Sequence, residues 1–181
     1  DPMPLRERNF TVVLDSVNGA GTAGGHSLLD AYGCDLTHLG SEPNGDFWHT
    51  PEPISENLTG LCEAVREHAA DIGCAQDPDA DRLALVDEQG HYIGEEYTLA
   101  LAAWRVLLEH PGANLVTNLS TSRMIDDVAE RFGATVYRSA VGEANVAAVM
   151  REHNAIAGGE GNGGIILPAI TFDSDSLSGM A

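Results

Sequence analysis

The sequence contains no lysine: all nine basic residues are arginines, against 28 aspartates and glutamates. The resulting formal charge of −19 argues against a nucleic-acid partner or an anionic membrane surface, because both require a cationic face. No apolar run approaches the roughly 18 residues of a membrane span, and the first residues lack the pattern of a signal peptide. We therefore expect neither a membrane protein nor a nucleic-acid-binding protein.

Cysteine is also scarce. Cys34, Cys62 and Cys74 are odd in number and have no C-x-x-C spacing, which predicts reduced thiols and a cytoplasmic location. The chain is rich in what a folded domain needs, with 20 glycines for tight turns and 43% hydrophobic residues for a core.

Strand-like and helix-like segments alternate along the chain. Strands are expected at 10–15, 35–39, 71–76, 82–87, 114–118, 135–138, 155–158 and 165–167, and helices at 24–32, 55–69, 95–109, 121–132 and 143–153. Ser55 is the expected N-cap of the second helix. Residues 110–113 (His-Pro-Gly-Ala) form the expected linker, because proline and glycine together end a helix. We predict an α/β protein with two consecutive three-layer α/β/α domains and mixed sheets, at residues 1–110 and 111–181, the second one truncated.

The most informative segment is residues 77–82, Asp-Pro-Asp-Ala-Asp-Arg, between two expected strands. Asp77, Asp79 and Asp81 alternate, so on an extended loop their side chains share one side and repel one another unless a cation lies among them. Oxygen ligands without histidine or cysteine suit Mg²⁺ or Ca²⁺ better than zinc. Arg82 adds a guanidinium fork suited to a phosphate or carboxylate. The pattern predicts a divalent metal that holds a phosphate.

Two other interpretations of this segment are a solvated acidic turn and a calcium loop of the EF-hand type. The second places three aspartates and Glu88 at ligand positions of that loop. It fails because Arg82 stands where the loop needs glycine, and because the flanks are strand-like where the EF-hand has helices.

Two glycine loops match G-x-G-x-x-G. The first, at 19–24, follows a strand, opens a helix and has Glu42 downstream, so a dinucleotide-binding domain of an NAD-linked oxidoreductase is an alternative. Four residues separate its first glycine from the apolar strand, which ends on Asp15 where a pyrophosphate would meet a carboxylate.

The second glycine loop, at 159–164, runs into a strand and lacks the lysine of a P-loop. It presents Glu160 and Asn162 on a backbone that a ligand can approach closely, and these groups suit sugar hydroxyls. A plain glycine-rich hairpin is the alternative.

Taken together, these segments resemble the phosphohexomutase family, which includes phosphoglucomutase, phosphomannomutase and phosphoglucosamine mutase. The matching pieces, in the family's order, are residues 14–21, 42–47, 51–58, 77–87, 122–123, 141–143 and 158–164. The resemblance implies the family's second and third domains only, because neither the Thr-Ala-Ser-His-Asn-Pro type of motif of the first domain nor the Arg-Ser-Gly-Thr type of loop of the fourth is present. We expect a fragment that is inactive alone and whose partners are domains I and IV of the same chain.

In this family a serine phosphate is passed to a hexose phosphate through a bisphosphate. The resemblance implies a sugar-phosphate substrate, Mg²⁺ as cofactor, and hexose 1,6-bisphosphate as activator of the full-length enzyme. It further implies metal ligands Asp77, Asp79 and Asp81, a catalytic Arg82 on the phosphoryl oxygens, and substrate-binding residues Gly142, Glu143, Glu160 and Asn162.

The second glycine loop and residues 141–143 are most similar to phosphoglucosamine mutases, since serine is usual at the position of Asn162 in the other types. Glucosamine phosphate is therefore the expected substrate, with glucose and mannose phosphates as alternatives. One departure is that Ser174 stands where the family commonly has an arginine. A non-catalytic module that binds metal or sugar phosphate is the remaining alternative.

Overall fold

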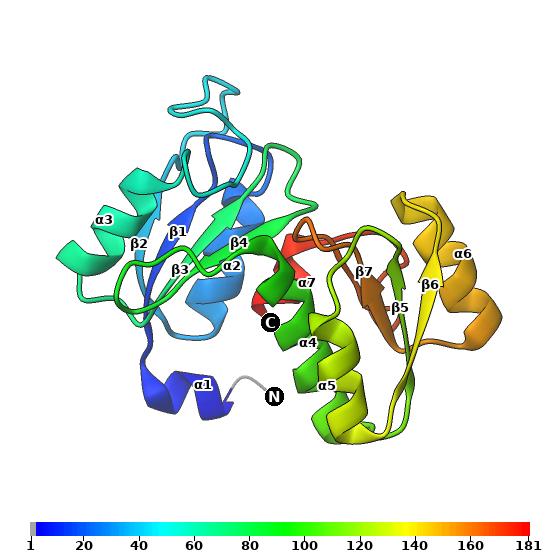
Figure 1. Ribbon diagram of the computed structural model, residues 1–181. Helices are drawn as coiled ribbons and strands as arrows, with labels where there is room; N and C mark the ends of the chain where they lie inside the picture. Colours follow the sequence, from blue (N-terminus) through cyan, green and yellow to red (C-terminus); the bar gives the residue numbers. More distant parts are fainter. Residues whose placement is uncertain (1–2) are drawn as a thin grey trace. The chain divides into compact units, whose positions relative to one another are not determined.

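The computed structural model describes residues 3–181 and divides into two compact units (Figure 1). The first runs to Gly94 and includes the last two residues, and the second is Glu95–Gly179. The division falls ahead of the linker at 110–113 that the sequence suggested. The reason is that helix α4 (Glu95–Glu109) belongs to the second unit, where it packs on helix α5 (Met124–Phe132).

The first unit is a three-layer α/β/α structure on a mixed sheet of order β2-β1-β3-β4 (Figure 1). Its strands are β1 (Thr11–Asp15), β2 (Asp35–Leu39), β3 (Ile72–Gln76) and β4 (Leu83–Val86), and its helices are α1 (Met3–Arg8), α2 (Thr22–Ala31) and α3 (Thr59–Glu67). Strand β1 pairs in parallel with β2 and β3, whereas β4 is antiparallel to β3. Leu29 of α2 packs with Leu14 on one face of the sheet, and Leu61 and Val65 of α3 pack with Val13 on the other.

The second unit repeats this plan on a sheet of order β6-β5-β7-β8. Its strands are β5 (Asn114–Asn118), β6 (Thr135–Ser139), β7 (Ala157–Gly159) and β8 (Ile165–Ile166), and after α4 and α5 come helices α6 (Glu143–His153) and α7 (Ser176–Met180). Helices α4 and α5 cover one face, around Leu115, and α6 covers the other through Val146, Met150 and Val116. The predicted fold class, two α/β domains with mixed sheets, is confirmed.

The two candidate loops occupy the same place in the two units. Residues 77–82 join β3 to β4, and residues 160–164 join β7 to β8, the antiparallel pair in each sheet. Because the central strands β1 and β5 run parallel to β3 and β7, each loop lies at the edge of the sheet where its central strand ends. Ligands of open α/β sheets bind at this carboxyl edge.

Helix α3 begins later than the sequence suggested. The expected N-cap, Ser55, lies in a turn in which the Asn57 amide donates to the Ile54 carbonyl at 3.0 Å. The helix starts at Thr59, after Leu58, whose side chain is buried in the core. The helix therefore begins four residues after Ser55, and the capping prediction at Ser55 is wrong.

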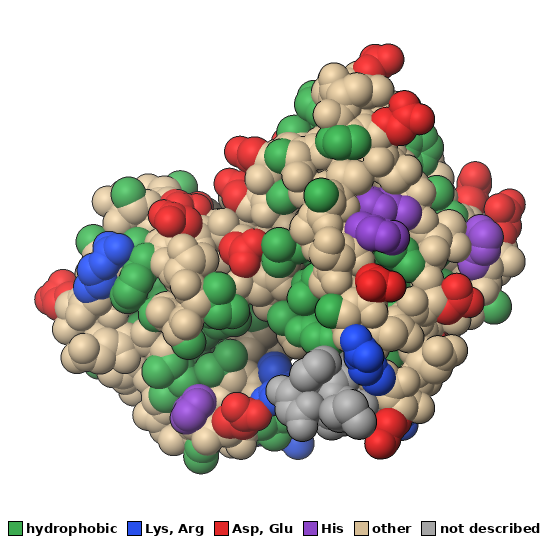
Figure 2. Space-filling model, turned by 180° about the vertical axis from the view of Figure 1, so that it is seen from behind, with side chains coloured by type: hydrophobic (Ala, Val, Ile, Leu, Met, Phe, Trp, Pro, Cys, Tyr) green, Lys and Arg blue, Asp and Glu red, His purple; other side chains and the backbone are tan. Residues whose placement is uncertain are grey.

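The surface reflects the composition. Figure 2 shows acidic side chains spread over the face it draws, with fewer basic ones, in keeping with the net charge of −19. The three cysteines are free thiols. None of the helices within residues 3–181 has the length and apolar character needed to cross a membrane.

Candidate functional site

The acidic loop brings its three aspartates together. One carboxylate oxygen from each of Asp77, Asp79 and Asp81 lies within 4.8 Å of the other two. Asp77 is buried, Asp81 is half-buried and Asp79 is exposed, so the cluster opens from the protein interior to solvent. The structure thus assembles the three side chains for which the sequence predicted a metal.

Asp81 lies in surroundings that disfavour its charged form. Burial raises its pKa to about 7, helped by a hydrogen bond and the charge of Asp77 and by the charge of Asp79. Its Oδ1 atom is buried without a hydrogen-bond partner among the described residues, and the Arg82 Nε atom stands 3.6 Å away. A cation would bind this oxygen and cancel the repulsion, and an all-oxygen donor set fits Mg²⁺. The residues present therefore fit a divalent metal ion.

Arg82 is held by two carboxylates of its own unit. Its Nε donates to Asp77 Oδ2 at 2.7 Å, and its Nη1 and Nη2 donate to the Glu52 carboxylate at 2.5 and 3.4 Å. Burial alone would lower the pKa of Arg82, but the hydrogen bonds to Glu52 and Asp77 outweigh it and raise that pKa. The guanidinium thus stays charged and oriented beside the acidic loop. The sequence did not single out Glu52, which lies between Pro51 and Pro53.

The first glycine loop packs closely against the acidic loop. The Ala20 amide donates to the Pro78 carbonyl at 2.8 Å. A Cβ atom on Gly19 would lie 2.6 Å from that same oxygen, and one on Gly21 would lie 2.6 Å from Gln76 Oε1. Gly19 is explained by the close approach of the two loops and Gly21 by the Gln76 side chain at the end of β3, so neither glycine requires a pyrophosphate.

A buried ion pair stands at the end of β1. Asp15, 1% exposed, accepts hydrogen bonds from Trp48 Nε1 at 3.1 Å and from His49 Nε2 at 2.9 Å. The other ring nitrogen of His49 lies 2.7 Å from the Thr50 carbonyl. Both ring nitrogens face acceptors, an arrangement that only the protonated imidazolium satisfies at both positions, so the site favours the charged ring. The hydrogen bond to Asp15 is the main cause that raises the pKa of His49.

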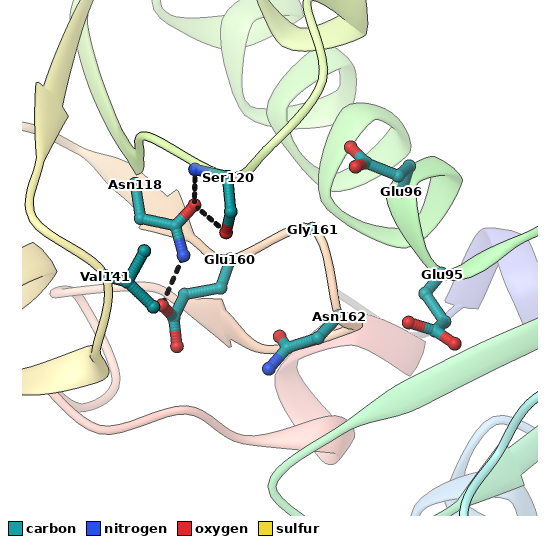
Figure 3. Close-up of a pocket in the computed structure, with 8 residues that line it drawn as sticks. All are labelled: Glu95, Glu96, Asn118, Ser120, Val141, Glu160, Gly161 and Asn162. Carbon is teal, nitrogen blue, oxygen red and sulfur yellow. Dashed lines mark hydrogen bonds between the residues drawn. The ribbon is translucent and has the colours of Figure 1, made fainter.

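The second unit has a pocket of about 260 Å³ at its glycine loop (Figure 3). Three carboxylates, Glu95, Glu96 and Glu160, and two amides, Asn118 and Asn162, are among its lining residues. The lining contains no arginine or lysine. The pocket therefore suits a ligand rich in hydroxyl groups or bearing a positive charge.

Glu160, Asn162 and Gly142 come together at this pocket. Glu160 Oε1 accepts hydrogen bonds from the Gly142 amide at 2.8 Å and from Asn118 Nδ2. Asn162 Oδ1 accepts one from the Gly164 amide at 3.2 Å, which shapes the loop itself. Figure 3 shows the Glu160 and Asn162 side chains on this loop, with Asn118 bonded to Glu160. The sequence did not indicate Asn118.

Glu143 lies next to the segment that carries Ser174, and its substrate-binding role stays a prediction. Its Oε2 accepts a hydrogen bond from the Ser174 amide at 3.2 Å, and Glu143 is not among the pocket-lining residues. Ser174 lies beside the glycine loop, because a Cβ atom on Gly164 would be 3.0 Å from its Oγ. Glu143 thus anchors the segment that carries Ser174.

Comparison with known proteins defines the family. Residues 3–90 match the model of phosphoglucomutase/phosphomannomutase α/β/α domain II, and residues 94–180 match that of domain III. The chain belongs to the phosphoglucomutase/phosphomannomutase family.

Individual relatives agree with this result. A phosphoglucomutase/phosphomannomutase of Thermococcus kodakarensis is 43% identical over 97% of this chain, and a probable phosphoglucosamine mutase of Methanococcoides burtonii is 41% identical over 96%. The chain spans 39% of the length of each of these relatives. The crystal structure of a family protein from Burkholderia thailandensis superposes with a TM-score of 0.87 at 29% identity, over 94% of this chain and 38% of that one.

Proposed function

We propose that the full-length protein to which this chain belongs is a Mg²⁺-dependent phosphohexomutase. It interconverts the 1-phosphate and 6-phosphate of a hexose through a phosphoserine and a bisphosphate intermediate. The observation that carries this proposal is the match of two consecutive family domains over nearly the whole chain. The phosphoserine would come from a part of the protein outside these 181 residues.

The acidic loop is the proposed metal site. Asp77, Asp79 and Asp81 would hold Mg²⁺, which supplies charge neutralisation for a phosphoryl group in transfer. Arg82 would donate its guanidinium fork to the phosphoryl oxygens. Glu52, whose side chain is 51% exposed, keeps that guanidinium charged and in place, and would yield to an incoming phosphoryl group.

The glycine loop is the proposed sugar site. Glu160 and Asn162 offer acceptors and a donor for sugar hydroxyls, and Gly142 helps to orient Glu160. Such groups suit a substrate that must bind in two orientations, because hydroxyls both donate and accept hydrogen bonds. Glu143 would act indirectly, by fixing the segment around Ser174.

Glucosamine phosphate is the proposed substrate. A pocket lined by three carboxylates and by no arginine or lysine complements an ammonium group at the sugar's second carbon. Ser174, in place of the arginine common in the family, adds no positive charge next to the loop. Relatives named as probable phosphoglucosamine mutases, such as those of Methanopyrus kandleri and Methanococcoides burtonii, support the same choice.

The test is ³¹P NMR of the full-length protein with Mg²⁺ and a trace of hexose 1,6-bisphosphate. The 1-phosphates of glucosamine, glucose and mannose are offered separately, and conversion of the glucosamine compound is expected to be fastest. Asp77→Asn should abolish turnover, whereas Asp30→Asn, which removes an exposed carboxylate of α2, should leave it unchanged. Failure of the wild-type protein to convert any of the three sugars would refute the proposal.

A further inference from the structure

Asn118 ends strand β5 and is only 2% exposed, and its side chain takes part in five hydrogen bonds with described residues. Its Oδ1 accepts from the Ser120 amide and hydroxyl at 3.0 and 2.9 Å, and from the Thr121 amide and hydroxyl at 2.9 and 2.8 Å. Backbone amides can only donate, so the atom that faces them must be the oxygen. The Nδ2 group is thereby directed at Glu160, and the orientation of the amide follows from its partners.

The carboxylate of Glu160 is held at one oxygen. Its Oε1 accepts from Asn118 Nδ2 and from the Gly142 amide, while within residues 3–181 no hydrogen bond reaches Oε2 (Figure 3). Two donors on one oxygen set the plane and direction of the carboxylate. The second oxygen is left for a ligand in the pocket that Glu160 lines.

The backbone on both sides of Glu160 is tied to the same turn. The Gly161 amide donates to Thr121 Oγ1 at 2.9 Å, and the Thr117 hydroxyl lies 2.9 Å from the Gly159 carbonyl. Both threonine hydroxyls belong to the buried network around Asn118. The glycine loop is therefore held by hydrogen bonds at Gly159, at Glu160 and at Gly161.

We propose that Asn118 is the positioning residue for Glu160, holding the carboxylate so that Oε2 is presented to a hydroxyl or ammonium hydrogen of the sugar. The identity of that ligand rests on the function proposed above. The orientation of Glu160 does not, because it follows from contacts within the second unit.

Asn118→Asp separates positioning from a merely structural role. The aspartate keeps an acceptor for all four donors of Ser120 and Thr121, so the turn is preserved. It loses the N–H group that binds Glu160 and places a second negative oxygen there. The matched control is Asn114→Asp at the other end of β5, which adds the same charge and also removes one N–H donor, the one to the His153 carbonyl.

In the full-length protein, Asn118→Asp should lower kcat/KM for glucosamine 1-phosphate by roughly 10- to 100-fold, the range for losing a hydrogen bond to a charged group. Asn114→Asp should stay within about twofold of wild type. In a Glu160→Ala background, Asn118→Asp should add less than about a twofold further loss, because its effect passes through Glu160. Wild-type kcat/KM in Asn118→Asp would overturn the assignment.

A measurement without substrate tests whether Asn118 binds Glu160, independently of the proposed function. In ¹⁵N NMR of the wild-type protein, the side-chain amide of Asn118 should exchange slowly with solvent, and Glu160→Ala should shift its signal and speed its exchange. An Asn118 signal that does not respond to Glu160→Ala would refute the contact. Absence of turnover with every sugar phosphate would refute the mutase proposal, and the NMR result would still decide the role of Asn118.

Discussion

Replacing Asp81 by asparagine should stabilise the metal-free protein at pH 8, even though it removes a proposed metal ligand. Burial, together with the charges of Asp77 and Asp79, raises the pKa of Asp81 from 3.8 to about 7. Because the folded state binds this proton more tightly than the unfolded chain, the contribution to stability is fully present below pH 3.8 and is lost as the pH rises through about 7. Above that pH the wild type keeps a carboxylate that its surroundings disfavour.

The magnitude follows from the spacing of the carboxylates. Two unit charges 4.8 Å apart repel by about 3.5 kcal/mol at an effective dielectric constant of about 20, and by about 0.9 kcal/mol in bulk water. The side chain of Asp81 is 44% exposed, so solvent screens much of this repulsion. We expect Asp81→Asn to raise the free energy of unfolding by about 1–2 kcal/mol at pH 8 without metal.

Urea unfolding of the chain, followed by the fluorescence of Trp48 in a Trp104→Phe background, reports on the first unit, because the chain has only these two tryptophans. In EDTA at pH 8 Asp81→Asn should be the more stable protein, and at pH 5 the difference should shrink. With MgCl₂ at pH 8 the wild type should gain more than the variant, because binding to the folded state stabilises it. Asp30→Asn controls for the relief of net charge. An equal gain from that control, or no gain from Asp81→Asn, would refute the reasoning.

Two further predictions concern the surroundings of the acidic loop. His49→Gln removes the charge-assisted bond to Asp15, so the wild type should exceed it in stability by about 1.5–3 kcal/mol at pH 6. Since the pKa of His49 is raised in the folded protein, this difference in the free energy of unfolding is fully present below about pH 6.5. It narrows as the pH rises through the pKa of folded His49. Equal differences at pH 6 and pH 9 in urea unfolding would contradict a charged His49 ring. Gly19→Ala places a Cβ atom 2.6 Å from the Pro78 carbonyl oxygen, so it should cost about 1–3 kcal/mol and weaken Mg²⁺ binding in calorimetric titration. Unchanged Mg²⁺ affinity in a folded Gly19→Ala protein would show that the two loops are independent.

The regular elements could largely be predicted, because their signals are local. Strand β5 at 114–118 and helix α6 at 143–153 have the predicted bounds, and the alternation of strands and helices was enough for the fold class. The start of α5 was missed, since the helix begins at Met124 and not at 121. Thr121 binds Asn118 through its amide and hydroxyl, and this tertiary contact outweighs its position in a helical pattern.

In the candidate sites too, local features could be predicted from the sequence and long-range contacts could not. The carboxylates of the acidic loop are neighbours in the chain, so their spacing alone indicates that they can meet around a cation. Glu52 reaches Arg82 across 30 residues and Asn118 reaches Glu160 across 42, and no local pattern reports such a pair. A usable signal did exist, because Asp15 and Asn118 are the polar residues on which the two central strands end, at the edge where α/β sheets bind ligands.

The two units share one architecture but differ in the loop that is the proposed site of each. Each places a loop between antiparallel strands at the edge where its central strand ends, so the backbone alone does not distinguish them. The hydrogen-bond donors around each loop do distinguish the two units. In the first unit Asp81 Oδ1 is buried and accepts no hydrogen bond from the described residues, with Arg82 Nε 3.6 Å away, so this oxygen is left for the proposed cation. In the second unit Asn118 and Gly142 satisfy one oxygen of Glu160 with N–H groups, which leaves the other oxygen for the proposed sugar. The supply of N–H donors at equivalent edges thus separates the proposed metal site from the proposed sugar site.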